Sequence, residues 1–415
     1  MTALVGVLNK RGAAIAADSA MTVFGNGSSK IYNNEQKIFP LSDKNPIGVM
    51  ICNNLNFLTT PWALIFELYK AERGDIAFPS LTGYVEDFID YLESMKRLQS
   101  PEVKNAFYQN EFEQLSDAFR SVFEEKYDEL TKSDPDIPNE KVSRDCYIQT
   151  FREIKEIVND NEINNRLKDF SIRDFYKEVV EPNEDYFSHK RKEFPRMTDK
   201  EWKNLLEFFH RDLINDTFSG PQQSEIIFVG YGEDDIFPAS QRVFILGMTG
   251  DSLKYNIEEI SEISHTSSAE IRPFAQTDVM ITLMKGVSPQ SDQEYRDATI
   301  ELEEGVINDI TSLLEKEKVS SKVIKKVKEL SYNKVHERYV DRIDKFINEN
   351  FVSGVVTALD FFNLEEMAKM AENLIAVTNL QRHISSSEES VGGPIEVAVI
   401  TKTAGFKWIK HNTFD

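Results

Sequence analysis

Strand-like apolar runs lie near both ends and in the middle of the chain, and long charged stretches separate them. The runs within residues 2–53, such as TALVGVL at 2–8, are almost continuously apolar. Continuous rather than alternating apolar runs are typical of strands that are covered on both faces. Further runs of this kind occur at 225–232, 242–248 and 392–409. The pattern predicts an α+β fold built on buried sheets.

Residues 98–221 and 288–361 have a different pattern, in which charges are frequent and apolar residues recur at helical spacing. Phe112, Leu115 and Phe119 are an example, and this spacing indicates one apolar face of a helix. Without the two segments roughly 220 residues remain, an ordinary size for one domain. We therefore predict one body interrupted by two helical insertions. The body would consist of residues 1–97, 222–287 and 362–415.

The chain is acidic, with 48 Lys and Arg against 70 Asp and Glu and a net charge of −22. Nucleic acids and anionic membranes attract positive surfaces, so we expect neither as a partner. No apolar run approaches the roughly 20 residues that a membrane-spanning helix needs. Two cysteines, Cys52 and Cys146, are too few for a disulfide scaffold or a four-thiolate zinc site. They fit a reducing cytosol, and Lys10 and Arg11 interrupt what would be a signal-peptide core, so we expect a cytoplasmic protein.

The second residue carries the first chemical hypothesis. If Met1 is removed, Thr2 becomes the N-terminal residue and holds a hydroxyl nucleophile and a free amine together. An N-terminal amine can serve as the base that activates a threonine hydroxyl. Its pKa of roughly 7.7 to 8.0 leaves a usable neutral fraction near pH 7, and a nearby ammonium group would lower that pKa further.

The surroundings of Thr2 resemble the start of the proteasome β-type peptidases and of related bacterial ATP-dependent proteases. These families begin with Thr, run through two strands to an acidic residue and place a Lys at the head of a later strand. Thr2, Asp18 and Lys37 occupy those positions. The runs EIIFVGYGEDD at 225–235 and VGGPIEVAVITKTAGFKWI at 391–409 are similar to the central and closing strands of the family.

The resemblance implies a four-layer α-β-β-α sandwich, the fold of N-terminal-nucleophile (Ntn) hydrolases. It also implies a peptidase without metal or organic cofactor, in which Thr2 attacks a peptide carbonyl. Lys37 would lower the pKa of the Thr2 amine, and Asp18 would hold Lys37. The backbone N–H of Asn53 would help to bind the oxyanion, at a position where the family has Gly. Glu388 and Ser390 would be supporting residues, with Val391 standing where the family has a Ser.

The family also suggests partners. We expect a peptide or protein substrate, self-association into a homo-oligomer and a possible protein partner such as an ATP-driven unfoldase. Two alternatives stay open at this point. The chain could be a catalytically silent scaffold that binds proteins through its helical insertions, or an Ntn amidohydrolase acting on a small amide.

Other patterns favour simpler interpretations. The six histidines lack the spacing of a zinc motif. The segment GNGSSK at 25–30 lacks the spacing of a phosphate-binding loop and is expected to be a loop between strands. A lysine-rich run at 316–328 has Val319, Val323 and Val327 at helical spacing. It is expected to be the solvated face of a helix, with a docking face for an acidic partner as the alternative.

Overall fold

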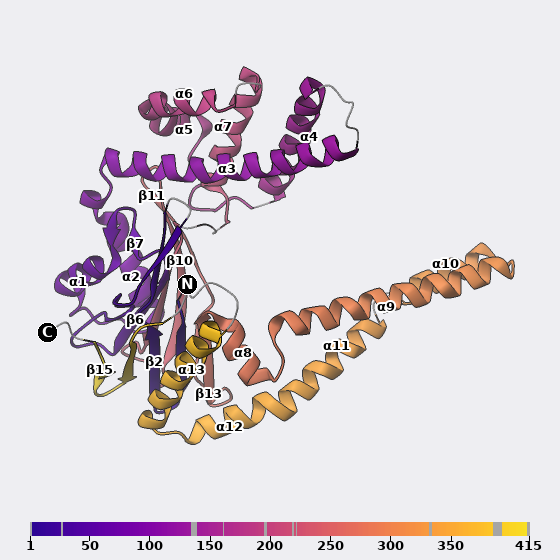
Figure 1. The fold of residues 1–415 in the computed structure, drawn as a ribbon. Coiled ribbons are helices and arrows are strands. Elements are labelled where there is room, and N and C mark those ends of the chain that lie inside the picture. Colours follow the sequence, from indigo (N-terminus) through magenta and orange to yellow (C-terminus); the bar gives the residue numbers. More distant parts are fainter. Residues whose placement is uncertain are drawn as a thin grey trace.

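The computed structural model describes residues 2–25, 28–133, 139–160, 162–194, 197–217, 220, 222–331, 334–384 and 392–412. Two antiparallel sheets lie against each other at the centre of the molecule, and helices cover the outer face of each (Figure 1). The predicted α+β class with buried sheets is confirmed at this level.

The first sheet contains strands from the beginning and the end of the chain. Its order is β13-β1-β2-β14-β15, and neighbouring strands are antiparallel. Strand β1 therefore lies inside the sheet, with β2 on one side and β13 on the other. The strands are β1 (Leu4–Asn9), β2 (Gly12–Asp18), β13 (Ala269–Ala275), β14 (Ile395–Thr401) and β15 (Gly405–Lys410).

The second sheet has the order β11-β10-β9-β6-β5, and the short strand β12 also pairs with β10. These strands are β5 (Ile38–Pro40), β6 (Ile47–Asn53), β9 (Ser224–Gly230), β10 (Ala239–Thr249), β11 (Ser252–Ile257) and β12 (Ser261–Glu262). Two small hairpins stand apart from both sheets. They are formed by β3 (Met21–Gly25) with β4 (Ser28–Tyr32) and by β7 (Asn56–Phe57) with β8 (Thr60–Pro61).

The expected loop at 25–30 is largely strand. Gly25 pairs with Ser28, and β4 continues to Tyr32. The β-branched residues Val23 and Ile31 favour an extended chain, and the hairpin uses the polar residues between them as part of its strands. The segment does join two strands, as expected, but Gly25 and residues 28–30 belong to those strands rather than to a loop.

The sequence of β2 explains how the second sheet can pack closely on one face of this strand and a helix on the other. Alternate side chains of a strand point to opposite faces. Ala13 and Ile15 lie in the core between the two sheets, whereas Ala14 and Ala16 lie in the core between the first sheet and its helices. Small residues on both faces let a neighbouring sheet and a neighbouring helix approach the strand together.

Helices complete the outer layers. Helices α1 (Trp62–Arg73) and α2 (Leu81–Ser94) pack on the second sheet through an aromatic-rich core. Helices α8 (Thr277–Lys285), α12 (Ser353–Phe361) and α13 (Leu364–Ile384) pack on the first sheet. Helix α8 begins at Thr277, because Phe274 and Ala275 still belong to β13.

Residues 98–221 contain a group of helices with a core of their own. Its helices are α3 (Pro101–Ser133), α4 (Asn139–Asp160), α5 (Ile172–Phe175), α6 (Glu184–Lys192) and α7 (Asp199–Ile214), joined by short 3-10 or π-helical turns at Lys96–Leu98, Tyr176–Val180 and Glu181–Asn183. The predicted aromatic core is present, since Phe112 and Phe119 are fully buried in it.

Residues 288–361 form an elongated helical arm that extends away from the sheets (Figure 1). The arm consists of α9 (Pro289–Lys316), α10 (Ser321–Ser331), α11 (Lys334–Ile347) and a π-helical turn (Asn348–Val352) that leads into α12. Within the described ranges, we find no helix that combines the length and the apolar character needed to span a bilayer.

Candidate active site

The candidate site begins at the peptide group between Thr2 and Ala3. Ala3 is buried and lies opposite Asp18, because Leu4 pairs with Ala17 in the β1–β2 hairpin. The Asp18 N–H donates to the Ala3 carbonyl at 3.1 Å. The N–H of the Thr2–Ala3 peptide donates to Asp18 Oδ1 at 2.8 Å. Backbone and side chain of Asp18 thus fix the point where Thr2 joins the sheet, and Thr2 itself is half-buried.

Asp18 also binds Lys37. The Lys37 Nζ atom lies 2.9 Å from Asp18 Oδ1, and both side chains are fully buried. Lys37 Nζ donates a second hydrogen bond to the carbonyl of Ala20. Because Asp18 ends β2 of the first sheet and Lys37 precedes β5 of the second, the ion pair joins the two sheets directly beneath Thr2–Ala3.

The Asp18 carboxylate has a full set of donors. Besides Ala3 N–H and Lys37 Nζ on Oδ1, its Oδ2 accepts from Ala20 N–H at 3.3 Å and from Gly392 N–H at 3.1 Å. A buried carboxylate needs such donors, since an ionised group without partners in the interior is very costly. The sequence prediction that Asp18 pairs with Lys37 agrees with this geometry.

Burial lowers the pKa of the Lys37 ammonium, and the neighbouring Asp18 carboxylate opposes that shift. A buried ion pair owes its existence to good geometry and to further hydrogen bonds that satisfy the remaining polar atoms. Both conditions hold here, since the carboxylate has four donors. The site therefore places a cationic side chain in the interior, next to the first residues of the chain.

Asn53 ends β6 with an unusual backbone conformation. Its φ is 64°, in the left-handed region that Gly adopts freely and that Asn tolerates better than most residues. The N–H of Ile51 donates to the Lys37 carbonyl at 2.9 Å. Because alternate N–H groups of a strand point to the same side, the N–H of Asn53 points toward the Lys37 side as well. Its side-chain amide is held by Glu225 Oε1 at 2.7 Å.

The two supporting residues from the sequence analysis, Glu388 and Ser390, lie outside the described residues. The glycine pair that follows them is well defined. Gly392 contacts Asp18 through its N–H, and Gly393 has φ of 73° beside the Asn33 backbone. A side chain at Gly393 would meet the Asn33 carbonyl at 2.9 Å, so the close approach requires glycine. The C-terminal strands are thereby fastened to the Asp18–Lys37 pair.

The start of α8 is a part of the site that the sequence did not reveal. Leu4 pairs with Ala275 at the end of β13. Strand β13 ends there, and Gln276 leads the chain into α8 close to the start of β1. Gln276 has φ of 51° and precedes α8. The strand was missed because Pro273 and alternating charged residues interrupt it, although Pro is compatible with an edge strand such as β13.

A polar cavity of about 390 Å³ lies beside the pair. Its walls include Ser19 and Gln36, the sequence neighbours of Asp18 and Lys37, together with Glu396 and His411. Glu396 Oε1 lies 2.8 Å from His411 Nδ1, and burial raises the pKa of the Glu396 carboxyl. In the described part of the chain, no cluster of three or more His, Cys, Asp or Glu could hold a metal ion.

Comparisons with known proteins add nothing to this geometry, since no family model, curated protein or solved structure matches the chain.

Proposed function

We propose that this chain is a proteasome-like N-terminal threonine hydrolase, and that its two sheets with their outer helices are the α-β-β-α sandwich of the Ntn hydrolases. The observation that carries the proposal is the Thr2–Ala3 peptide bound to Asp18, which in turn holds a fully buried Lys37. The reaction that fits best is cleavage of a peptide bond.

The proposed mechanism requires removal of Met1. The free Thr2 amine, directly or through a water, then accepts the proton of the Thr2 hydroxyl while Oγ attacks the substrate carbonyl. The tetrahedral intermediate carries an oxyanion, which backbone N–H donors stabilise. Asn53 N–H is the donor that we assign to this role. The intermediate collapses as the amine returns the proton to the leaving nitrogen, and water then hydrolyses the Thr2 ester.

Lys37 would act through its charge rather than by proton transfer. An ammonium group near the Thr2 amine disfavours a second positive charge, and therefore lowers the pKa of that amine. Asp18 fixes Lys37 Nζ at 2.9 Å and the start of β1 at 2.8 Å. Because Asp18 binds both Lys37 and the Ala3 N–H next to Thr2, it would keep the Thr2 amine and the Lys37 ammonium at a fixed position relative to each other.

We propose that the substrate is a peptide or protein, that the protein is cytoplasmic, and that the reaction uses no metal or organic cofactor. The proposal also includes self-association, and a protein partner such as an ATP-driven unfoldase that delivers substrate. The acidic charge of the chain disfavours nucleic acid and anionic membrane as partners.

The first test is whether Thr2 is the N-terminal residue and the nucleophile. Intact mass spectrometry should show loss of Met1, and a peptide epoxyketone should label the protein at Thr2. Thr2→Ala should abolish labelling and peptide hydrolysis, whereas the control Thr59→Ala, at an exposed threonine, should leave both unchanged. Retention of Met1, or equal labelling of Thr2→Ala, would contradict the mechanism.

A second candidate is a catalytically silent scaffold that binds protein partners through its helical insertions. The large exposed apolar side chains along the arm favour it, for example Leu302 and Leu313. Such a protein would keep its fold and its partners when Met1 stays attached. Hydrolysis that depends on Thr2 would exclude this candidate.

A further inference from the structure

Helix α9 carries an apolar stripe that is largely exposed, although Tyr295 at its near end also borders the cavity between α9 and α11. Tyr295, Leu302, Val306 and Leu313 are 57%, 67%, 50% and 58% exposed. Their spacing of seven, four and seven residues places them along one side of the helix, as in the a and d positions of a heptad. Ile307, which follows Val306 by one residue and so lies about 100° around the helix from it, is buried, and α9 packs on α10 and α11. The helix thus has one covered and one uncovered apolar face.

We propose that α9 pairs with α9 of a second copy, antiparallel, about a two-fold axis level with residue 304. The heptad positions along the exposed face, here called the seam, are Tyr295, Thr299, Leu302, Val306, Asp309 and Leu313. In antiparallel helix pairs an a position lies opposite a d position of the partner. With the axis at 304, Tyr295 lies opposite Leu313 of the second copy, and Leu302 lies opposite Val306.

The polar positions of the seam obey the same symmetry. Thr299 lies opposite Asp309 of the second copy, and its hydroxyl, which donates to the Tyr295 carbonyl within α9 at 2.7 Å, would turn from that bond to the carboxylate. Extending the heptad by one position at each end places Asp292 opposite Lys316. Every apolar seam residue therefore meets an apolar one, and each acidic residue meets a donor or a cation. Such a self-complementary contact is what a two-fold interface requires.

This match selects one register. Shifting the second helix by one heptad in one direction would place Asp309 opposite Asp292. Shifting it by one heptad in the other direction would place Asp309 opposite Val306. Both shifts bury a carboxylate without a suitable partner, which is unfavourable. A polar residue at a seam position commonly fixes the register of paired helices in this way.

Small side chains lie along one flank of the seam. Ala298, Gly305 and Ser312 are exposed and spaced seven residues apart beside it. A side chain built at Gly305 would meet no atom within 4 Å. Small residues let two helix backbones approach closely, so this flank can accommodate the second helix without a clash.

The charge along the arm favours the antiparallel direction independently of the seam. The half of α9 nearest the sheets exposes Glu294, Asp297 and Glu301. The far half lies beside α10, which exposes Lys322 and Lys326. Antiparallel pairing brings α10 of one copy level with the acidic near half of α9 in the other. The lysine-rich run thus has an acidic partner within a second copy of the same chain.

Cysteine crosslinking of the full-length protein tests direction and register. A Tyr295→Cys chain mixed with a Leu313→Cys chain should form a disulfide-linked heterodimer. Neither variant alone should crosslink, because equal positions at these ends would lie about 27 Å apart. The two natural cysteines are buried, and Ile236→Cys, at an exposed residue outside the arm, is the control. A Tyr295→Cys homodimer, or no heterodimer above the control, would overturn the pairing.

Sedimentation equilibrium tests the seam itself. Leu302→Asp with Val306→Asp should raise the dimer dissociation constant at least about 100-fold, because two carboxylates enter an apolar contact. Lys316→Asp should weaken self-association as well, because it would place an aspartate of one copy opposite Asp292 of the other. Circular dichroism checks that each variant keeps its helices. A monomeric wild-type chain, or a dimer unaffected by these changes, would overturn the proposal, and neither result depends on Thr2.

Discussion

The two helical insertions differ in how far they bury their apolar side chains. Residues 98–221 bury their apolar side chains among themselves and against the second sheet, as Phe107 and Leu246 of β10 share one core. The arm formed by residues 288–361 is elongated, and α9 leaves large apolar side chains exposed. An amphipathic helix is stabilised chiefly by packing of its apolar face. The first insertion thus packs its apolar side chains within one chain, whereas the arm leaves some of them exposed, and the proposed pairing of two α9 helices would cover these.

Attachment to the sheets differs as well. In the first insertion, Lys104 of α3 donates to the Gly250 carbonyl at 2.6 Å, and the Tyr108 hydroxyl accepts from Gly250 N–H at 3.0 Å. The β10–β11 turn is thus held by α3. The arm is joined through α8 and α12, and its far half contacts no sheet in Figure 1. Changes in the first insertion should therefore reach the body, whereas changes in the arm should stay local.

The largest expected difference is in the free energy of unfolding, between the variants Phe112→Ala in the first insertion and Leu302→Ala in the arm. Phe112 is fully buried, with ring centroids of Phe187 and Phe209 at 5.0 and 5.2 Å. Its removal should cost about 3 to 5 kcal/mol, because the cavity cannot close fully. Leu302 is exposed, so its replacement should change the free energy of unfolding of the monomer by less than about 0.5 kcal/mol.

Urea denaturation at a protein concentration below the dimer dissociation constant would measure both variants. Low concentration matters, because association would add stability to the wild-type arm that Leu302→Ala lacks. Equal losses in the two variants would contradict the contrast between a covered and an uncovered insertion.

Much of the candidate site could be predicted from order along the chain. Thr2, Asp18 and Lys37 lie far apart in sequence, and they were named because they occupy the positions that the resemblance to the proteasome family implies. Gly392 and Gly393 lie in the run that is similar to the closing strands of the family, but their contacts with Asp18 and with Asn33 could not be read from sequence. These contacts depend on the two sheets meeting, which is a property of the whole fold.

Other features left no local signal. Strand β13 was missed because Arg272 and Pro273 disturb its apolar pattern. The αL conformation of Asn53 depends on the end of β6 and on its contact with Glu225. The seam of α9 was not recognised, because apolar periodicity alone does not say which of two apolar faces of a helix is covered.

A pH-dependent contrast comes from Glu111 of α3, which is buried near Asp212 and Lys254. Burial raises the pKa of Glu111 to about 7, with the Asp212 carboxylate adding to the shift and Lys254 opposing it. The folded state therefore holds this proton more tightly than the unfolded state does. The stability contributed by the proton is present at low pH and is lost as pH rises from about 4.5 to 7.

Glu111→Gln should remove this dependence. Relative to wild type, the variant should gain about 1 to 3 kcal/mol in unfolding free energy between pH 5 and pH 8. Urea denaturation at both pH values measures the difference. Glu124→Gln, at an exposed carboxylate on the same helix, should show no such gain. A wild-type-like pH profile for Glu111→Gln would show that Glu111 is not protonated in the folded protein.

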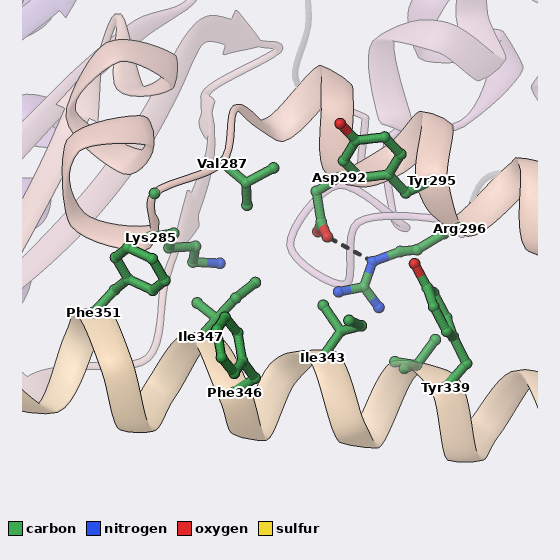
Figure 2. Close-up of a pocket in the computed structure, with 12 residues that line it drawn as sticks. Lys285, Val287, Asp292, Tyr295, Arg296, Tyr339, Ile343, Phe346, Ile347 and Phe351 are labelled. Atoms are coloured by element: carbon green, nitrogen blue, oxygen red, sulfur yellow. Dashed lines mark hydrogen bonds and ion pairs between the residues drawn. The ribbon is translucent and has the colours of Figure 1, made fainter.

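The smallest expected change in stability comes from replacing an arginine that links two helical segments, once in each insertion. In the arm, Arg296 of α9 binds Asp292 at 3.1 Å and Asp344 of α11 at 2.7 Å, beside a cavity of about 330 Å³ (Figure 2). In the first insertion, Arg120 of α3 binds Asp117 at 3.2 Å and Glu193, just beyond α6, at 2.8 Å. The two arginines thus make matched contacts, one within the helix and one across to another segment.

Arg296→Met and Arg120→Met should each cost less than about 1 kcal/mol, because partly exposed ion pairs contribute little. The response in hydrogen exchange should differ. The first insertion keeps α3 and α6 together through its aromatic core, so Arg120→Met should leave exchange unchanged. Between α9 and α11 there is a cavity instead of a packed aromatic core. Arg296→Met should therefore speed hydrogen exchange in α11. Equal exchange in both variants would mean that the apolar side chains around the cavity suffice to hold the arm together.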